Sequence, residues 1–287
     1  MPSSRPPRAA RSRSSFRHWR TALVVSAFAA AAAVGVGVAV QLPSAGAGTR
    51  ITDGFVAQPP APTPAPSTPS VSPPPPVTPS APAAPVLTLS GPGPAKGRGS
   101  FAYDERTSGV LGRAGTLRRY RVAVENGSGE EVRAFGEAVQ RALAGPGSWV
   151  DGGELRLQRV GPDDRYDFTI YLATRDTAGR LCGAGGIDIR VGGVPYTSCR
   201  VPGKVVINLD RWRTSAPHLV AAGMPLDTYR LYVVNHEVGH QLGHRHEGCP
   251  GAGRAAPVMQ QQTLFLKGCR PNPWPYVGGK RYTGPAL

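Results

Sequence analysis

The apolar positions of this chain follow two periodicities, and the first is that of β-strands. Short apolar or alternating runs typical of strands occupy residues 117–124, 155–160, 167–173 and 204–209. The last run contains Val205, Val206 and Ile207 in succession, which predicts the most deeply buried strand. The first run ends just before Asn126-Gly127, a dipeptide typical of turns.

The second periodicity is helical and predicts two main helices. Apolar side chains recur at helical spacing through residues 130–143, with Ser128 as a candidate N-cap. Gly145-Pro146-Gly147 would end this helix, because glycine and proline both disfavour it. A second helix is expected from about residue 225 to about Gly243, with no regular element of any length after it. Two helices packed on a small mixed sheet, followed by an irregular C-terminal part, is an α+β layout.

The N-terminal residues have the pattern of an export segment. Residues 1–20 are basic and without acidic residues, which predicts that they stay in the cytoplasm. Residues 21–42 are uncharged and long enough as a helix to cross a bilayer. They fit a transmembrane signal anchor or a signal peptide cleaved near Ala47. Either alternative places the rest of the chain outside the cytoplasm, membrane-anchored or secreted.

A proline-rich linker is expected over residues 43–95. Residues 58–95 contain 15 prolines in 38 positions, so this stretch cannot bury a core and is expected to be disordered. Only residues 96–287 have the mixed composition of a folded domain, which is expected to be a monomer. Their 26 basic and 17 acidic residues leave a charge of +9, which could favour an anionic cell-wall polymer. No cluster of basic and aromatic residues points to nucleic acid.

The four cysteines predict two disulfides. None forms a C-x-x-C pair, and an even number in an exported chain is typical of disulfides. Three pairings are open. We favour Cys182 with Cys199 and Cys249 with Cys269, because these pairs close short loops.

The most informative segment is residues 236–246, which fits H-E-x-x-H-x-x-G-x-x-H at every specified position. His236 and His240 would share one face of a helix, so that both imidazoles can bind one metal ion. Glu237 follows the first ligand and can reach a water molecule on that ion as a general base.

The third ligand requires a change of chain direction. Eight residues of straight helix rise roughly 12 Å, which is too far for His244 to join His236 on one ion. Gly243 can adopt positive φ and end the helix, after which His246 can return to the metal. We therefore expect His246 as the third ligand, with His244 as the alternative. Three protein ligands with an open fourth position are typical of catalytic Zn²⁺.

This run resembles the zinc motif of the metzincin clan of metallopeptidases. Met259, thirteen residues after His246, resembles the Met-turn of that clan, an apolar support beneath the metal. The context around residues 206–210, Cys249 and Cys269 also resembles an uncharacterised zincin-like domain of exported actinobacterial proteins. The chain departs from some clan members in having no Met-x-Tyr after the turn and no recognisable cysteine-switch propeptide.

The resemblance implies a zincin-like domain over residues 96–287 and a zinc metalloendopeptidase. In such an enzyme Glu237 would activate a zinc-bound water to hydrolyse a peptide or protein substrate. Two alternatives stay open: a hydrolase of cell-wall peptides or amides, and a non-catalytic binding module stabilised by zinc. A carboxylate is also expected to orient one ligand imidazole, with Asp210, Asp227 and Glu247 as candidates.

Overall fold

The computed structural model describes residues 83–287. The expected cytoplasmic segment, the apolar segment 21–42 and the cleavage point near Ala47 lie outside the described residues and stay predictions. Among residues 83–287, no helix is both long and apolar enough to span a bilayer.

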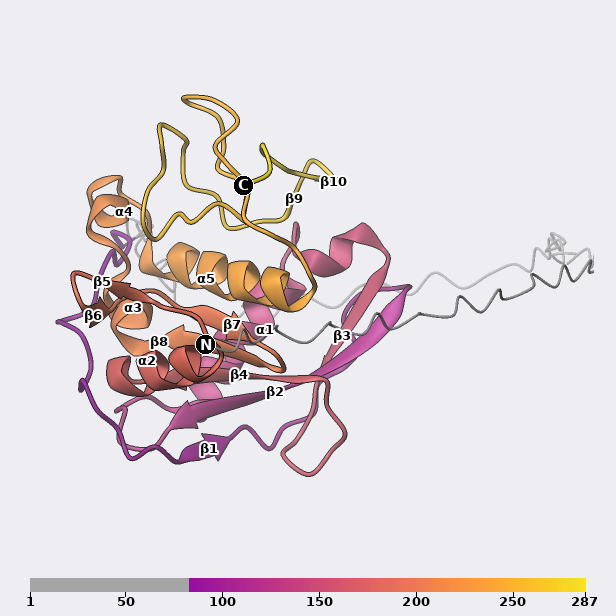
Figure 1. Ribbon diagram of the computed structural model, residues 1–287. Coiled ribbons are helices and arrows are strands. Elements are labelled where there is room, and N and C mark those ends of the chain that lie inside the picture. The colour runs from indigo at the N-terminus through magenta and orange to yellow at the C-terminus, as the bar shows by residue number, and fades with distance from the viewer. Residues whose placement is uncertain (1–82) are drawn as a thin grey trace, which may run out of the picture. The chain divides into compact units, whose positions relative to one another are not determined.

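A six-stranded mixed sheet forms the centre of the described domain (Figure 1). Its strands are β1 (Phe101–Tyr103), β2 (Thr116–Glu125), β3 (Leu155–Arg159), β4 (Phe168–Ala173), β7 (Cys199–Val201) and β8 (Lys204–Asn208). The order is β1-β2-β4-β8-β7, and β3 pairs with the first half of β2. β2, β3, β4 and β8 are parallel, whereas β1 and β7 pair antiparallel at the two ends of this order. The four predicted strands are confirmed, because their apolar patterns reflect burial in this sheet.

Helices cover both faces of the sheet. They are α1 (Val132–Ala144), α2 (Arg175–Ala184), α3 (Leu209–Thr214), α4 (Pro217–Ala221) and α5 (Leu226–Gln241), with a 3₁₀ turn at Trp149–Gly152. Val205 and Ile207 of β8 join the core that includes residues of α1 and α5, while Val206 joins a smaller core with α2. This alternation makes three layers, with α5 and α1 on one side and α2 on the other. The predicted α+β class is confirmed.

The two main helices occur as predicted, with one correction at a helix start. α1 begins at Val132 after Glu131, and no side chain caps it. Ser128 is not the cap, because its hydroxyl accepts a hydrogen bond from the backbone N–H of Glu130 before the helix starts. The short helices α2, α3 and α4 were not predicted.

The C-terminal part covers α5 on the side away from the sheet and contains almost no regular structure (Figure 1). Its regular elements are the two-residue strands β9 (Tyr276–Val277) and β10 (Lys280–Arg281). A similar short hairpin, β5 (Arg190–Val191) with β6 (Val194–Pro195), lies between α2 and β7. Both predicted disulfides are present, Cys182 with Cys199 and Cys249 with Cys269. Two disulfides fit a protein that folds outside the cytoplasm.

The folded part begins before residue 96. The backbone carbonyls of Val86 and Ala95 accept hydrogen bonds from residues of α5 and α2, and Leu89 packs against the main core. Residues 86–95, placed in the linker by their composition, therefore lie against the domain. A proline-rich composition reports how little a segment can bury by itself and does not exclude pairing with a neighbouring element.

Candidate metal centre

Helix α5 supplies the first residues of the candidate site. Val234 and Val238 of α5 are fully buried in the core against the sheet. On its other side, the Tyr232 hydroxyl donates to the Gln260 carbonyl and accepts from the Gln262 N–H. The helix is thus fixed from two sides, which holds its last turns in a defined orientation.

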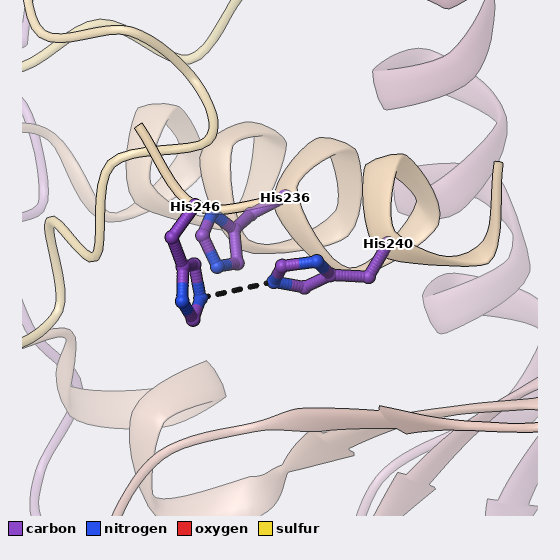
Figure 2. Close-up of side chains that lie close together, drawn as sticks. All are labelled: His236, His240 and His246. Carbon is purple, nitrogen blue, oxygen red and sulfur yellow. Dashed lines mark hydrogen bonds between the residues drawn. The ribbon is translucent and has the colours of Figure 1, made fainter. Parts of the chain in front are cut away.

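Three histidines converge at the end of this helix (Figure 2). One ring nitrogen of each of His236, His240 and His246 lies within 4.8 Å of the others. The Nε2 atoms of His240 and His246 are 3.0 Å apart. α5 ends at Gln241, and Gly243 has a φ of +99°, so the chain turns back and brings His246 to the two helical histidines. These three side chains could hold a metal ion.

His244 takes a different position. Its ring stacks on Trp149, with the ring centroids 4.3 Å apart. It is not part of the three-histidine cluster. Of the two alternatives for a third ligand, the structure brings His246, and not His244, to His236 and His240.

Backbone carbonyls orient two of the three imidazoles. Nδ1 of His236 lies 2.8 Å from the carbonyl oxygen of Val258, and Nδ1 of His240 lies 2.8 Å from that of His244. As Nδ1–H donors, both rings present Nε2 to the cluster.

The predicted carboxylate partner of a ligand imidazole was wrong. The three candidates instead pair with arginines, Asp210 with Arg175, Asp227 with Arg230 and Glu247 with Arg281. The Val258 carbonyl can take the place of a carboxylate as the partner of His236, because the turn around Val258 passes directly against α5.

The electrostatics of the cluster favour neutral imidazoles. Burial and the neighbouring His240 lower the pKa of His236 to about 3, and the same two causes lower the pKa of His246 to about 4. Burial also lowers the pKa of His240. All three rings are therefore neutral near pH 7, which is the form that binds a metal ion.

A cavity of about 690 Å³ opens over the cluster and contains Glu237 as well as the three histidines. Glu237 is 5% exposed, and within residues 83–287 its carboxylate makes no hydrogen bond or ion pair. Burial raises the pKa of this carboxyl to about 8. A carboxyl group beside three possible ligands, with no protein partner, can exchange a proton with a molecule in the cavity.

Met259 lies in a turn that packs against the same helix. It is fully buried, and a Cβ built on Gly239 would come within 2.5 Å of its sulfur. Gly239 therefore allows the turn to approach α5 closely. The role of Met259 as an apolar support beneath a metal ion stays a prediction.

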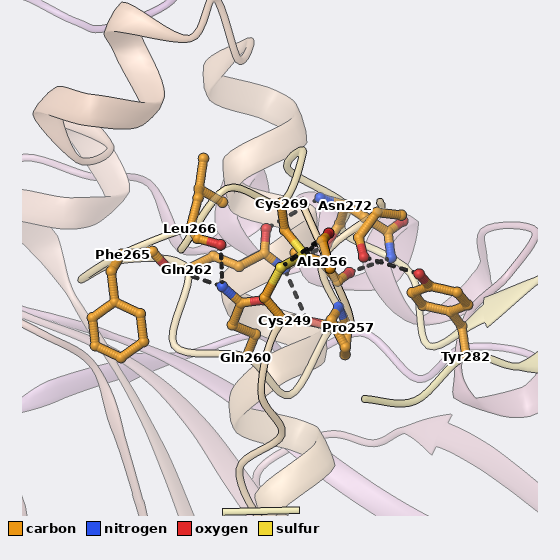
Figure 3. Close-up of a disulfide and its surroundings, with 12 residues drawn as sticks. Cys249, Ala256, Pro257, Gln260, Gln262, Phe265, Leu266, Cys269, Asn272 and Tyr282 are labelled. Atoms are coloured by element: carbon orange, nitrogen blue, oxygen red, sulfur yellow. Dashed lines mark hydrogen bonds between the residues drawn. A yellow bond between two sulfur atoms is a disulfide. The ribbon is translucent and has the colours of Figure 1, made fainter. Parts of the chain in front are cut away.

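The segment around this turn is held by a disulfide and by buried amide side chains (Figure 3). The Gln262 side chain donates to the carbonyls of Pro257 and Asn272 and accepts from the Asn272 N–H. The Asn272 side chain donates in turn to the Ala256 carbonyl. Cys249 and Cys269 bracket the turn. Side chains thus satisfy the backbone groups that a helix or sheet would otherwise pair.

Sequence reasoning missed Trp149, which contacts both His244 and Arg281 beside the site. Arg281 stacks over Trp149 with its guanidinium 5.0 Å from the ring centroid, and it pairs with Glu247 at 2.8 Å. Trp149 also donates to the backbone carbonyl of Asn235, next to His236. No local pattern connects these residues, because they come from three distant segments.

Fold and site together define an α+β protein with two disulfides and a three-histidine cluster able to hold a metal ion. Residues 88–277 match the family described as "Protein of unknown function (DUF3152)". Because this match covers more than half of the chain, the protein belongs to that family. No curated protein and no solved structure matches the chain.

Proposed function

We propose that this protein is a zinc-dependent metallopeptidase that acts outside the cytoplasm. The observation that carries the proposal is the convergence of His236, His240 and His246 in a cavity that also holds the unpaired carboxyl of Glu237. The expected zincin-like fold and the Met-turn role of Met259 belong to the same proposal.

The donor set fits zinc. All three candidate donors are imidazole nitrogens, and no thiolate is available because both cysteine pairs are oxidised. Carbonyl partners fix the tautomers of His236 and His240 as zinc ligands require. Structural zinc sites have four protein ligands, whereas catalytic zinc sites typically have three and leave the fourth position open.

The chemistry that zinc supplies when bound is a lowered pKa for water and a polarised substrate carbonyl. Glu237 takes the proton from the attacking water as the new C–O bond forms at the peptide carbonyl carbon. The same carboxyl then gives this proton to the amide nitrogen as the C–N bond breaks, which releases an amine and a carboxylic acid. Burial favours the protonated form of Glu237, whereas a divalent cation held by the three histidines would favour its carboxylate, so that this group can both take and return the proton.

The edge of the sheet offers a place for the substrate. β7 is the last strand in the sheet order and pairs antiparallel with β8. Cys199 and Arg200 of β7 line the cavity, together with Ser198 just before the strand. An extended peptide can add to a free strand edge by main-chain hydrogen bonds. Such a peptide would lie along the cavity that contains Glu237.

The test combines metal analysis with cleavage of a peptide library by the purified full-length protein. We expect one zinc per chain, and replacing Glu237 by Ala should keep zinc while lowering kcat by at least about 100-fold. His246→Ala should lose zinc, whereas His244→Ala is the matched control within the same motif and should keep it. Unreduced cleavage by the Glu237→Ala protein, or a wild type that binds no zinc, would contradict the proposal.

A further inference from the structure

Arg200 is the β7 side chain that points toward the candidate site. Its neighbours Cys199 and Val201 are buried in the small core with α2. Because successive side chains of a strand point to opposite faces, Arg200 lies on the face of α5. Its Nε donates to the Gln241 side chain at 3.0 Å, at the end of α5, and the residue lines the same cavity as the three histidines.

The charge of Arg200 is not neutralised by the protein. Within the described part of the chain it forms no ion pair, and Gln241, its hydrogen-bond partner, is neutral. By contrast, the carboxylate of Asp188, which lines the same cavity, accepts two hydrogen bonds from the Arg190 guanidinium, at 2.8 and 3.0 Å, and a third from the Arg190 backbone N–H. The other cavity arginine, Arg245, is exposed on the rim.

We infer that Arg200 selects peptide substrates with an Asp or Glu side chain close to the cleaved bond. This inference rests on the proposed peptidase function and names its substrate class. In a peptide added along β7, the residue opposite Arg200 would have its Cβ roughly 5 Å away and on the same face. The two Nη groups of Arg200, which carry no protein partner among residues 83–287, can form paired hydrogen bonds to a carboxylate there.

The experiment uses full-length zinc-loaded protein and a set of quenched peptides that place Glu, Gln or Lys in turn at each position around one cleaved bond. Gln has the shape of Glu without its charge. At one position, kcat/KM for the Glu peptide should exceed that for the Gln peptide by at least about tenfold. This ratio should fall as salt is added. Arg200→Gln should bring the ratio close to one, and Arg200→Glu should shift the preference to Lys.

A binding measurement separates this inference from the proposed function. Calorimetry with the Glu237→Gln protein should show tighter binding of the Glu peptide than of the Gln peptide. If this preference is found but the wild-type protein cleaves no peptide, the result would support Arg200 as the selector and would refute the proposed peptidase function. Cleavage with no preference for Glu at any position would overturn the inference alone. An equal loss of preference in the control variant Arg245→Gln would also overturn the inference, because the selectivity would then come from the overall positive electrostatic potential around the cavity and not from Arg200.

Discussion

Two glycines in the histidine run are needed for different physical reasons. At Gly239 the helix is regular, but an added Cβ would meet Met259 and Trp149, at 2.5 and 2.6 Å. At Gly243 an added Cβ would meet nothing within 4 Å, yet φ is +99°. The first glycine therefore serves packing, and the second serves only the direction of the backbone.

Replacing Gly243 by Ala isolates the backbone effect. We expect the free energy of unfolding to fall by about 1–2 kcal/mol, because an L-residue at positive φ is strained. Zinc affinity should fall as well, because any relaxation of this strain moves His246 away from His236 and His240. Urea unfolding and competition with a chelator measure the two effects. Gly243→Asn is the matched control and should lose less, since Asn tolerates positive φ better than Ala; equal losses for Ala and Asn would contradict the argument.

At the scale of elements, Glu125 connects β2 to the start of α2. Its carboxylate is 1% exposed and accepts hydrogen bonds from the Thr174 N–H and from the hydroxyls of Thr174 and Thr177. It also accepts from the Gly99 N–H. Because the first N–H groups of a helix have no partner within it, a buried carboxylate at this end stabilises α2. α2 in turn carries Cys182, which fixes β7 through the disulfide to Cys199.

This cap predicts a pH dependence of stability. Burial raises the pKa of Glu125, but the hydrogen bonds from Thr177, Thr174 and Gly99 outweigh it, so that the pKa in the folded state lies below the ordinary value of 4.5. The stabilisation is therefore complete above pH 4.5 and is lost as the pH falls through the lower folded-state pKa. Glu125→Gln should reduce the free energy of unfolding by about 1–3 kcal/mol at pH 7 and by less at pH 3. Urea unfolding at both values tests this, with the exposed Glu154→Gln as control; a loss that is the same at pH 3 would refute the cap.

The elements that the sequence predicts are those whose burial has a simple period. β8 and α5 show their burial as runs of apolar residues, and the three histidines follow from spacing and one glycine. α2 was missed because only Thr177, Ala178 and Cys182 of its ten residues are buried. The carbonyl of Val258 was missed as the partner of His236 because every residue has a carbonyl, and only the path of the chain selects one.

At the scale of the whole molecule, the segment after α5 is ordered by buried side chains together with scattered backbone hydrogen bonds. Residues 242–287 wrap α5 with no helix and only two-residue strands, yet Gln260, Gln262 and Asn272 are buried. Their amides bond to carbonyls of the same segment, and Tyr232 and Asn235 of α5 bond to it from the helix. The cluster thus depends on a region whose stability comes from cross-links and not from periodic structure.

The two disulfides provide a matched test of this dependence. They close loops of similar length, with sequence separations of 17 and 20, so removing either pair should cost a similar free energy of unfolding, about 3 kcal/mol. Their effects on the cluster should differ. The loop from Cys249 to Cys269 contains Val258, whose carbonyl orients His236.

We therefore expect the double variant Cys249→Ser with Cys269→Ser to bind zinc at least about tenfold more weakly than wild type, because loss of an orienting partner typically costs this much. The control, Cys182→Ser with Cys199→Ser, should lose similar stability and much less zinc affinity, since its loop contains no partner of a ligand imidazole. Urea unfolding and chelator competition on both proteins give the two quantities. Equal zinc affinity in the two variants would mean that α5 and Gly243 hold the histidines without help from the C-terminal segment.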